Sequence, residues 1–443
     1  MLTRICLILA LLGATPLWSQ VAPSASGGTT NPDDDSRMNM PPPVGGESSP
    51  MTGTAEERSN FLSGGLTFIT AYQDNVFAGG TSGPVGDETY SILPTISLDQ
   101  RTPRQHRTLS YSSGFVFYHP TSDLNSVQQN ASLGYVYRFS PRTTLSVRDS
   151  FLQSTNAFNQ SASLSGAAKS GPEGLPTVAV IAPFANQLGN SADVVISYQF
   201  GEDGMVGGSG STALLDYPNR SQVPDLYNYT SAGGSGFYSR RLTSSQYIGA
   251  IYKYSESATT PLSSTTETHT ISLFYTLYVN RNLTFSFSGG PQYYNSTETG
   301  AVSTHSWDPA GTASVEWRGL HYNLNAKYSR SIYGGGGLLG TFETNDAALS
   351  WNWQMKRTWS LNTSGIYLNS KNVAPVQAFS SPGGHTVSES ASIQHRMGER
   401  LSAEAGYSRL DQQYSGIGFV STTPSSDRVY VSVSYQLSRP LGR

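Results

Sequence analysis

Charged side chains are scarce in this sequence of 443 residues. They make up 13% of the chain, against roughly 25% in typical soluble domains. The 27 basic and 30 acidic side chains leave a net charge of -3, which argues against a nucleic-acid-binding protein because such proteins are normally basic. The 11% of aromatic residues disfavour wholesale disorder, since disordered chains contain few aromatics.

Long apolar runs are missing beyond the N-terminus. Mean hydropathy is -0.32, and a helical membrane span needs about 20 consecutive apolar residues. Residues 1–20 are predicted to be a secretory signal peptide, because Arg4 precedes the apolar run Ile5–Leu12 and small residues follow it. The alternative, an N-terminal membrane anchor, is disfavoured because this run is short.

Cysteine is nearly absent. The single one, Cys6, lies inside the predicted signal peptide, so the mature protein is expected to have no disulfide and no cysteine-ligated metal. Residues 21–60 are rich in Pro, Gly, Ser and Met and include Asp33–Asp35 and Pro41–Pro43. Such a segment buries too little apolar surface to offset its ordering entropy, and we predict a disordered periplasmic tail.

What the chain does contain, over residues 61–437, is alternation of apolar and polar side chains, which is typical of β-strands. Val429, Val431, Val433 and Tyr435 alternate with Tyr430, Ser432, Ser434 and Gln436, and residues 347–356 repeat the pattern. Alternating segments of about ten residues with aromatics near their ends are the signature of a transmembrane β-barrel.

A soluble β-sandwich or propeller would also alternate, but two features favour the barrel. The polar face carries Ser, Asn, Gln and Thr more than Lys and Glu, and tight connections such as Ser140–Pro141 alternate with long ones such as 156–188. We therefore predict an all-β, antiparallel, up-and-down transmembrane barrel of about 18 strands, within a range of 16 to 20, with short periplasmic turns and long outer loops. Residues 438–443 would form a C-terminal tail.

The lumen lining follows from the same alternation. If the apolar alternates face lipid, the inward set includes Asp99, Arg138, Asp193, Lys253, Glu316, Lys327, Asn352, Gln354, Arg396 and Glu404. Opposite charges on facing walls would create a transverse field that orients polar solutes. Alternatively, these groups pair with one another and fill the lumen, as interior groups must be satisfied or hydrated. The sequence leaves both interpretations open.

Three further patterns concern the two ends of the barrel. Arginines gather at the tight turns and acidic residues at the long loops, which would polarise the barrel from end to end. Aromatics near predicted strand ends, Tyr294, Tyr414 and Tyr430 among them, are assigned to an interfacial girdle. The run Gly334–Gly337 lacks the Lys-Ser/Thr of a phosphate loop and is predicted to be a flexible loop tip.

No catalytic constellation emerges from the sequence. The seven histidines show no metal-ligand spacing such as H-E-x-x-H, and there is no G-x-S-x-G motif. His305 with Asp308, and His119 with Asp123, are better explained as solvated loop residues than as parts of a barrel-embedded hydrolase. We expect a protein that is not an enzyme and that needs no cofactor or metal.

Two segments resemble a family of outer-membrane β-barrel porins, some of them encoded beside exopolysaccharide genes. Tyr72–Phe77 looks like that family's Y-x-D-N-x-[FIV] segment, and Val431–Arg443 is similar to its final strand and tail. The chain departs from general outer-membrane barrels in lacking a terminal aromatic, because six residues follow Leu437. The resemblance implies a location in the outer membrane, with lipid, lipopolysaccharide and the barrel-assembly machinery as partners.

The function expected from these patterns is a passive, porin-like channel for small hydrophilic solutes. It depends on the polar inward face and on a strand count large enough for an aqueous lumen. The alternative is a non-catalytic accessory in the export or surface anchoring of an exopolysaccharide, which depends on the family resemblance and on the long Ser/Thr/Gly-rich loops. Whether the segment 156–188 folds into the lumen is the observation that the sequence leaves open.

Overall fold

A computed structural model of the chain describes residues 60–76, 84–119, 121–155, 158, 185–220, 226–298, 303–374, 383–415 and 425–440. The predicted signal peptide, nearly all of the predicted tail and most of the segment 156–188 lie outside these residues. The strands, and a short 3-10 helix η2, are β1 Phe61–Gln73, β2 Asp87–Arg101, β3 Gln105–His119, η2 Ser122–Leu124, β4 Ser126–Arg138, β5 Thr143–Ser154, β6 Gln187–Phe200, β7 Gly204–Asp216, β8 Asn228–Thr243, β9 Gln246–Thr260, β10 Ser264–Asn280, β11 Leu283–Glu298, β12 Thr304–Arg318, β13 Tyr322–Gly334, β14 Thr341–Lys356, β15 Trp359–Asn372, β16 Gly383–Arg396, β17 Leu401–Ser415 and β18 Ser425–Pro440.

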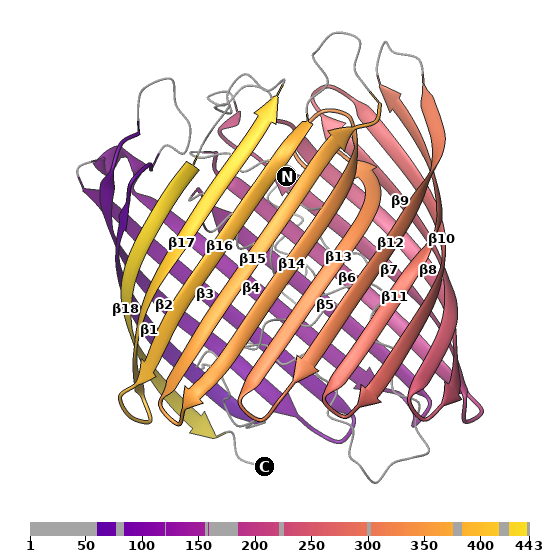
Figure 1. Cartoon of the computed structure of the whole chain (residues 1–443), viewed down its shortest axis with the longest axis horizontal. Helices are drawn as coiled ribbons and strands as arrows, with labels where there is room; N and C mark the ends of the chain where they lie inside the picture. The colour runs from indigo at the N-terminus through magenta and orange to yellow at the C-terminus, as the bar shows by residue number, and fades with distance from the viewer. Residues whose placement is uncertain are drawn as a thin grey trace.

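The strands form one closed antiparallel barrel (Figure 1). Each strand from β2 to β17 pairs with the next along the chain, and β1 pairs with β18 from Phe61↔Pro440 to Gln73↔Arg428. On its other side β1 lies against β2, where the Thr89 hydroxyl donates to the carbonyl of Ala71 over 3.4 Å. The predicted all-β up-and-down barrel of about 18 strands is confirmed.

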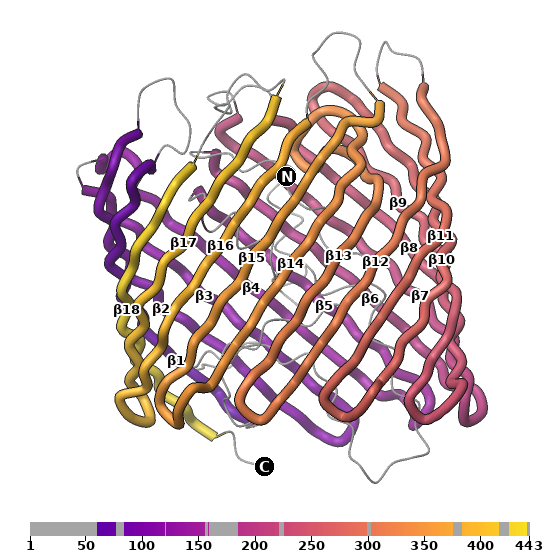
Figure 2. The backbone as a smooth tube through the Cα atoms, viewed as in Figure 1, coloured from indigo at the N-terminus to yellow at the C-terminus, as the bar shows by residue number. Residues whose placement is uncertain are grey.

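The two ends of the barrel differ (Figure 2). Connections such as Ser244–Ser245 and Arg281–Asn282 reverse the chain in two residues at what we call the turn end. At the opposite end, which we call the loop end, connections run up to 32 residues, between Ser154 and Gln187. The arginines of the tight turns and the acidic residues of the long connections therefore lie at opposite ends where the structure describes them.

The two faces of the wall differ as the alternation predicts. Large apolar side chains such as Phe68, Leu273 and Trp307 are 46%, 65% and 62% exposed on the outer face. Their strand neighbours are hydroxyl or amide side chains that point inward, such as Thr67 and Ser272. No helix in the described part of the chain is long and apolar enough to cross a membrane.

Three aromatics assigned to an interfacial girdle lie elsewhere, so that assignment is wrong for them. Tyr294 is 4% exposed and shares strand parity with the buried Gln292 and Ser296 on the inner face of β11. Tyr414 is 2% exposed and belongs to a cluster of buried hydrophobic residues, because it shares strand parity with the buried Leu410 and Gln412. Tyr430 shares parity with the buried Ser426 and Ser432, and its hydroxyl donates inside the barrel to Glu404. All three side chains point into the lumen.

Candidate functional site: the lumen and the hairpin that crosses it

The strand register places the ten predicted lining residues on the inner face. Asp193, for example, is 8% exposed and alternates with the outward Val194 and Ile196. Lys327 is the cross-strand partner of Ser314, which is buried. The ten residues are distributed around the wall, from β2 to β17, and do not converge on one point. Their role in permeation stays a prediction.

Hydroxyl pairs join neighbouring strands across this inner face. Ser and Thr side chains on adjacent strands meet at 2.6–3.1 Å, and each pair satisfies its polar atoms within the wall. The pairs are Thr67–Ser434, Ser110–Ser132, Ser150–Ser191, Ser209–Ser235, Ser255–Thr268, Thr276–Ser286 and Ser364–Ser390. The polar face predicted from Ser, Thr, Asn and Gln is therefore built largely from short side chains that pair with one another within the wall.

Several of the lining charges have partners close by. Asp99 lies 3.2 Å from a ring nitrogen of His106, and the Arg318 guanidinium lies 2.5 Å from Glu316. Glu404 accepts a hydrogen bond of 2.9 Å from Tyr430. For these three carboxylates the arrangement matches local pairing, one of the two interpretations left open by the sequence.

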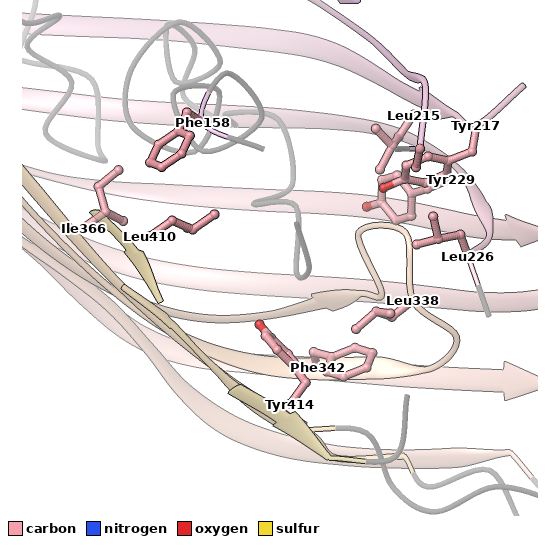
Figure 3. Packing of buried hydrophobic residues seen from close by; sticks show 11 residues of the cluster. Phe158, Leu215, Tyr217, Leu226, Tyr229, Leu338, Phe342, Ile366, Leu410 and Tyr414 are labelled. Atoms are coloured by element: carbon pink, nitrogen blue, oxygen red, sulfur yellow. The ribbon is translucent and has the colours of Figure 1, made fainter. Parts of the chain in front are cut away.

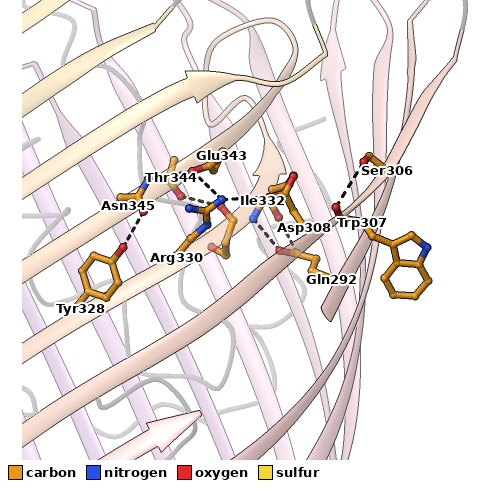
Figure 4. A network of polar contacts seen from close by, with 11 residues as sticks. Gln292, Ser306, Trp307, Asp308, Tyr328, Arg330, Ile332, Glu343, Thr344 and Asn345 are labelled. Atoms are coloured by element: carbon orange, nitrogen blue, oxygen red, sulfur yellow. Dashed lines mark hydrogen bonds and ion pairs between the residues drawn. The ribbon is translucent and has the colours of Figure 1, made fainter. Parts of the chain in front are cut away.

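The pairing between neighbouring wall strands is interrupted between β12 and β13. The β11–β12 ladder runs from Leu283↔Trp317 to Ser296↔Thr304, whereas the β12–β13 ladder ends at Gly311↔Arg330. At this point Arg330 Nη2 lies 3.1 Å from Asp308 of β12 and 3.2 Å from Glu343 of β14 (Figure 4). Arg330 therefore ties three strands together where β13 leaves the wall.

Beyond Arg330 the β13–β14 hairpin crosses the inner face of the barrel. Ile332 of β13 donates to Gln292 of β11 over 2.8 Å, and Gln292 Nε2 donates back to the carbonyl of Ile332 over 2.9 Å (Figure 4). Because β12 lies between β11 and β13 in the wall, this reciprocal pair places the end of β13 inside β12. On the return strand β14, the Thr341 hydroxyl lies 2.7 Å from Thr266 of β10 and 2.8 Å from Ser296 of β11.

The tip of the hairpin reaches the β7–β8 connection. Tyr227 donates its backbone N–H to Gly337 over 3.0 Å. Gly337 has φ +100, and a Cβ placed there would lie 2.7 Å from the Tyr217 hydroxyl, so only glycine suits this approach. Burial against the tip raises the pKa of Tyr217 above its usual range.

Apolar side chains of the tip and of both walls belong to one cluster of buried residues (Figure 3). Leu338, on the loop, is 2% exposed, and Phe342 of β14 is fully buried. They belong to one cluster with residues of β7, β8, β15, β17 and two connections, namely Phe158, Ala185, Leu215, Tyr217, Leu226, Tyr229, Ile366, Leu410 and Tyr414. The barrel is therefore bridged near its loop end, from β7–β8 to β14–β17.

The prediction of a flexible tip at Gly334–Gly337 is wrong. The segment 334–340 is buried throughout, because its apolar pair Leu338–Leu339 packs inside the barrel and its glycines allow backbone approaches that side chains would block. The pair Leu338–Leu339 is the one signal of this burial in the sequence, since two adjacent leucines are unfavourable at a loop tip that is exposed to water. Phe158 and Ala185, from the connection predicted to be able to fold inward, also lie in the cluster.

One of the residue pairs considered for catalysis, His305 with Asp308, has its two side chains engaged elsewhere. Asp308 is engaged by Arg330, and the ring of His305 lies 6.4 Å from that of Tyr293 on the outer face. Within the residues that the structure describes, no group of three or more His, Cys, Asp or Glu side chains is placed to hold a metal ion.

Compared by sequence, the chain matches no family model and no curated protein. Solved structures with a similar course of the chain include the ferric citrate transporter FecA in its unliganded form, at 11% identity and a TM-score of 0.42 over 86% of this chain. The match spans 65% of the FecA chain, less than two-thirds of its length. OpdL of Pseudomonas aeruginosa matches at 12% identity and a TM-score of 0.38, over 85% of this chain and 98% of its own. OccAB4 of Acinetobacter baumannii matches at 11% and 0.39, over 86% and 99%.

Proposed function

We propose that the protein is an outer-membrane channel. An apolar outer face around a closed barrel suits a lipid bilayer, in which every backbone polar group must be satisfied within the protein. A signal peptide, proposed from the sequence, would export the chain. Outer-membrane lipid, lipopolysaccharide and the barrel-assembly machinery are the partners that such a location implies.

The activity that we propose is passive diffusion of small hydrophilic solutes, without catalysis. The observation that carries it is the inner face, where cross-strand hydroxyl pairs and amide side chains line a barrel of 18 strands. Barrels of this size leave an aqueous lumen when their interior is polar. The β13–β14 hairpin would narrow this lumen at the loop end, so that it sets the size of the solutes that pass.

Conductance of the purified protein in a planar lipid bilayer tests the proposal. We expect stepwise currents, and swelling of proteoliposomes in small sugars but not in large ones. A barrel that stays silent at all voltages, and vesicles that stay impermeable, would contradict it. In that case the accessory role in exopolysaccharide export, which the sequence resemblance alone supports, becomes the function to test by gene deletion and measurement of secreted polymer.

A further inference from the structure

Arg428 of β18 is an inward arginine in an unusual setting. Its cross-strand partners are Gln73 of β1 and Ser408 of β17, and it shares strand parity with the buried Ser426. The guanidinium carbon lies 5.8 Å from the ring centre of Phe158 and 5.7 Å from that of Tyr430. The cation is therefore held by two aromatic faces inside the barrel.

In the part of the chain that the structure describes, no carboxylate forms an ion pair with this cation. Two other inward arginines do have a carboxylate partner: Arg318 pairs with Glu316 at 2.5 Å, and Arg241 pairs with Asp203 at 2.9 Å. Among the described residues, no carboxylate lies within ion-pair distance of Arg428, and the adjacent Asp427 points outward toward Arg409 and Tyr407. An aromatic ring that stacks on a guanidinium does not accept hydrogen bonds from the N–H groups at its edge. A guanidinium such as that of Arg428 has five such N–H donors.

Neighbouring residues hold the Tyr430 ring in place beside Arg428. A Cβ on Gly406 would lie 2.5 Å from the Tyr430 hydroxyl, so the absence of a side chain at this position lets the ring lie across β17. The Tyr430 hydroxyl donates to Glu404 over 2.9 Å, which anchors the far end of the ring. On the other side, Gln73 is held by hydrogen bonds of 3.0 Å to Ser426 and to the carbonyl of Asn75. The polar groups of Tyr430 and Gln73 thus have hydrogen-bond partners other than Arg428.

We propose that Arg428 is an anion-binding site in the lumen and that it selects small solutes carrying a carboxylate. A guanidinium presents a planar fork that matches the two oxygens of a carboxylate, and such charge-assisted pairs are the strongest hydrogen bonds in proteins. The inference rests on the proposed channel function for its physiological meaning, since the site would enrich organic anions on their path through the lumen.

Acetate is the probe that tests the site, in two measurements on the full chain. In planar bilayers, the permeability ratio of acetate to potassium comes from the reversal potential in a potassium acetate gradient. In detergent solution, line broadening of ¹³C-acetate reports binding without any need for conductance. We expect Arg428→Gln to weaken acetate binding about tenfold, as expected for loss of a charge-assisted hydrogen-bonded pair, and to lower the permeability ratio.

Two further variants separate recognition from charge. Arg428→Lys keeps the positive charge but loses the fork, so chloride permeability should persist while the preference for acetate over chloride falls. Arg241→Gln removes an inward arginine that Asp203 already balances, and it should leave acetate binding unchanged. Heat-modified gel mobility checks that each variant is folded.

The proposal is overturned if folded Arg428→Gln binds acetate as the wild type does, or if the wild type shows no acetate binding. A wild type that binds acetate but carries no current would contradict the channel function and leave the anion site standing. A wild type that conducts without any acetate preference, with the Arg428→Gln variant unchanged, would contradict the anion site and leave the channel function standing.

Discussion

Strand β12 is paired along its full length on one edge and only along part of its length on the other. Toward β11 the ladder is complete from Leu283↔Trp317 to Ser296↔Thr304, while toward β13 it stops at Gly311↔Arg330. The strand is the same, so its own β-propensity does not explain the difference. The explanation lies in the partner: β13 finds other hydrogen-bond partners inside the barrel, in Gln292, and the loop that follows it buries two leucines there. A wall strand can therefore be drawn inward when the interior satisfies its backbone groups.

The largest effect on this arrangement is expected from Gln292→Leu. The change leaves the buried N–H and carbonyl of Ile332 without partners, at about 1–3 kcal/mol for each group. Urea unfolding of the protein in lipid vesicles, followed by tryptophan fluorescence, measures the loss. Gln394→Leu is the matched control, because Gln394 is also inward but, among the described residues, accepts a single long bond of 3.4 Å from Ser360. Equal losses for the two variants would contradict the role assigned to Gln292.

Gly337→Ala should have a smaller effect. It forces a side chain into a positive-φ conformation beside Tyr217, at a cost of about 1–3 kcal/mol, part of which the loop relieves by shifting. The expected result is a less stable protein with noisier single-channel currents. Gly365→Ala provides the control, since nothing lies within 4 Å of a Cβ at that position on β15. If Gly337→Ala behaves as Gly365→Ala does, the tip is not held as described.

The smallest effect on stability is expected from Arg330→Met. Its side chain is 34% exposed, and partly exposed ion pairs contribute about 1 kcal/mol or less. Because Arg330 ties β12 and β14 at the point where β13 departs, the change should still increase the frequency of current fluctuations. Arg409→Met is compared with it, as Arg409 lies on the outer face with its carboxylates at 3.9 Å. Identical current records for the two variants would remove this role from Arg330.

The fold could be predicted because it depends on local alternation. Val429, Val431 and Val433 face outward while Ser432 and Ser434 face inward, as period 2 requires. The same rule already placed Tyr430 on the polar face, so its assignment to the girdle ignored a signal that was present. The inward orientation of the lining residues, from Asp99 to Glu404, follows from their odd or even position along each strand alone.

The hairpin could not be predicted because its contacts are distant in sequence. Gln292 and Ile332 are 40 residues apart, and Thr266 and Thr341 are 75 apart. Gly334–Gly337 has the composition of an exposed turn, and the difference is made by partners on β7 to β11 that no local pattern identifies. Arg428 was likewise missed, because its distinguishing feature is that no described carboxylate lies within ion-pair distance of it, and this depends on strands that meet only when the barrel closes.

The central claim is that the β13–β14 hairpin lies across the lumen. In a Cys6→Ala background, Ser257→Cys on β9 and Gly334→Cys on β13 test it directly, because a Cβ on Gly334 lies 3.2 Å from Cβ of Ser257. Disulfides need Cβ atoms about 3.5–4.5 Å apart, which a small adjustment provides, so we predict rapid disulfide formation on mild oxidation and none in the single variants. If the hairpin instead continued the wall, four strand spacings would separate the two positions by about 19 Å. Two cysteines that stay reduced would contradict the account.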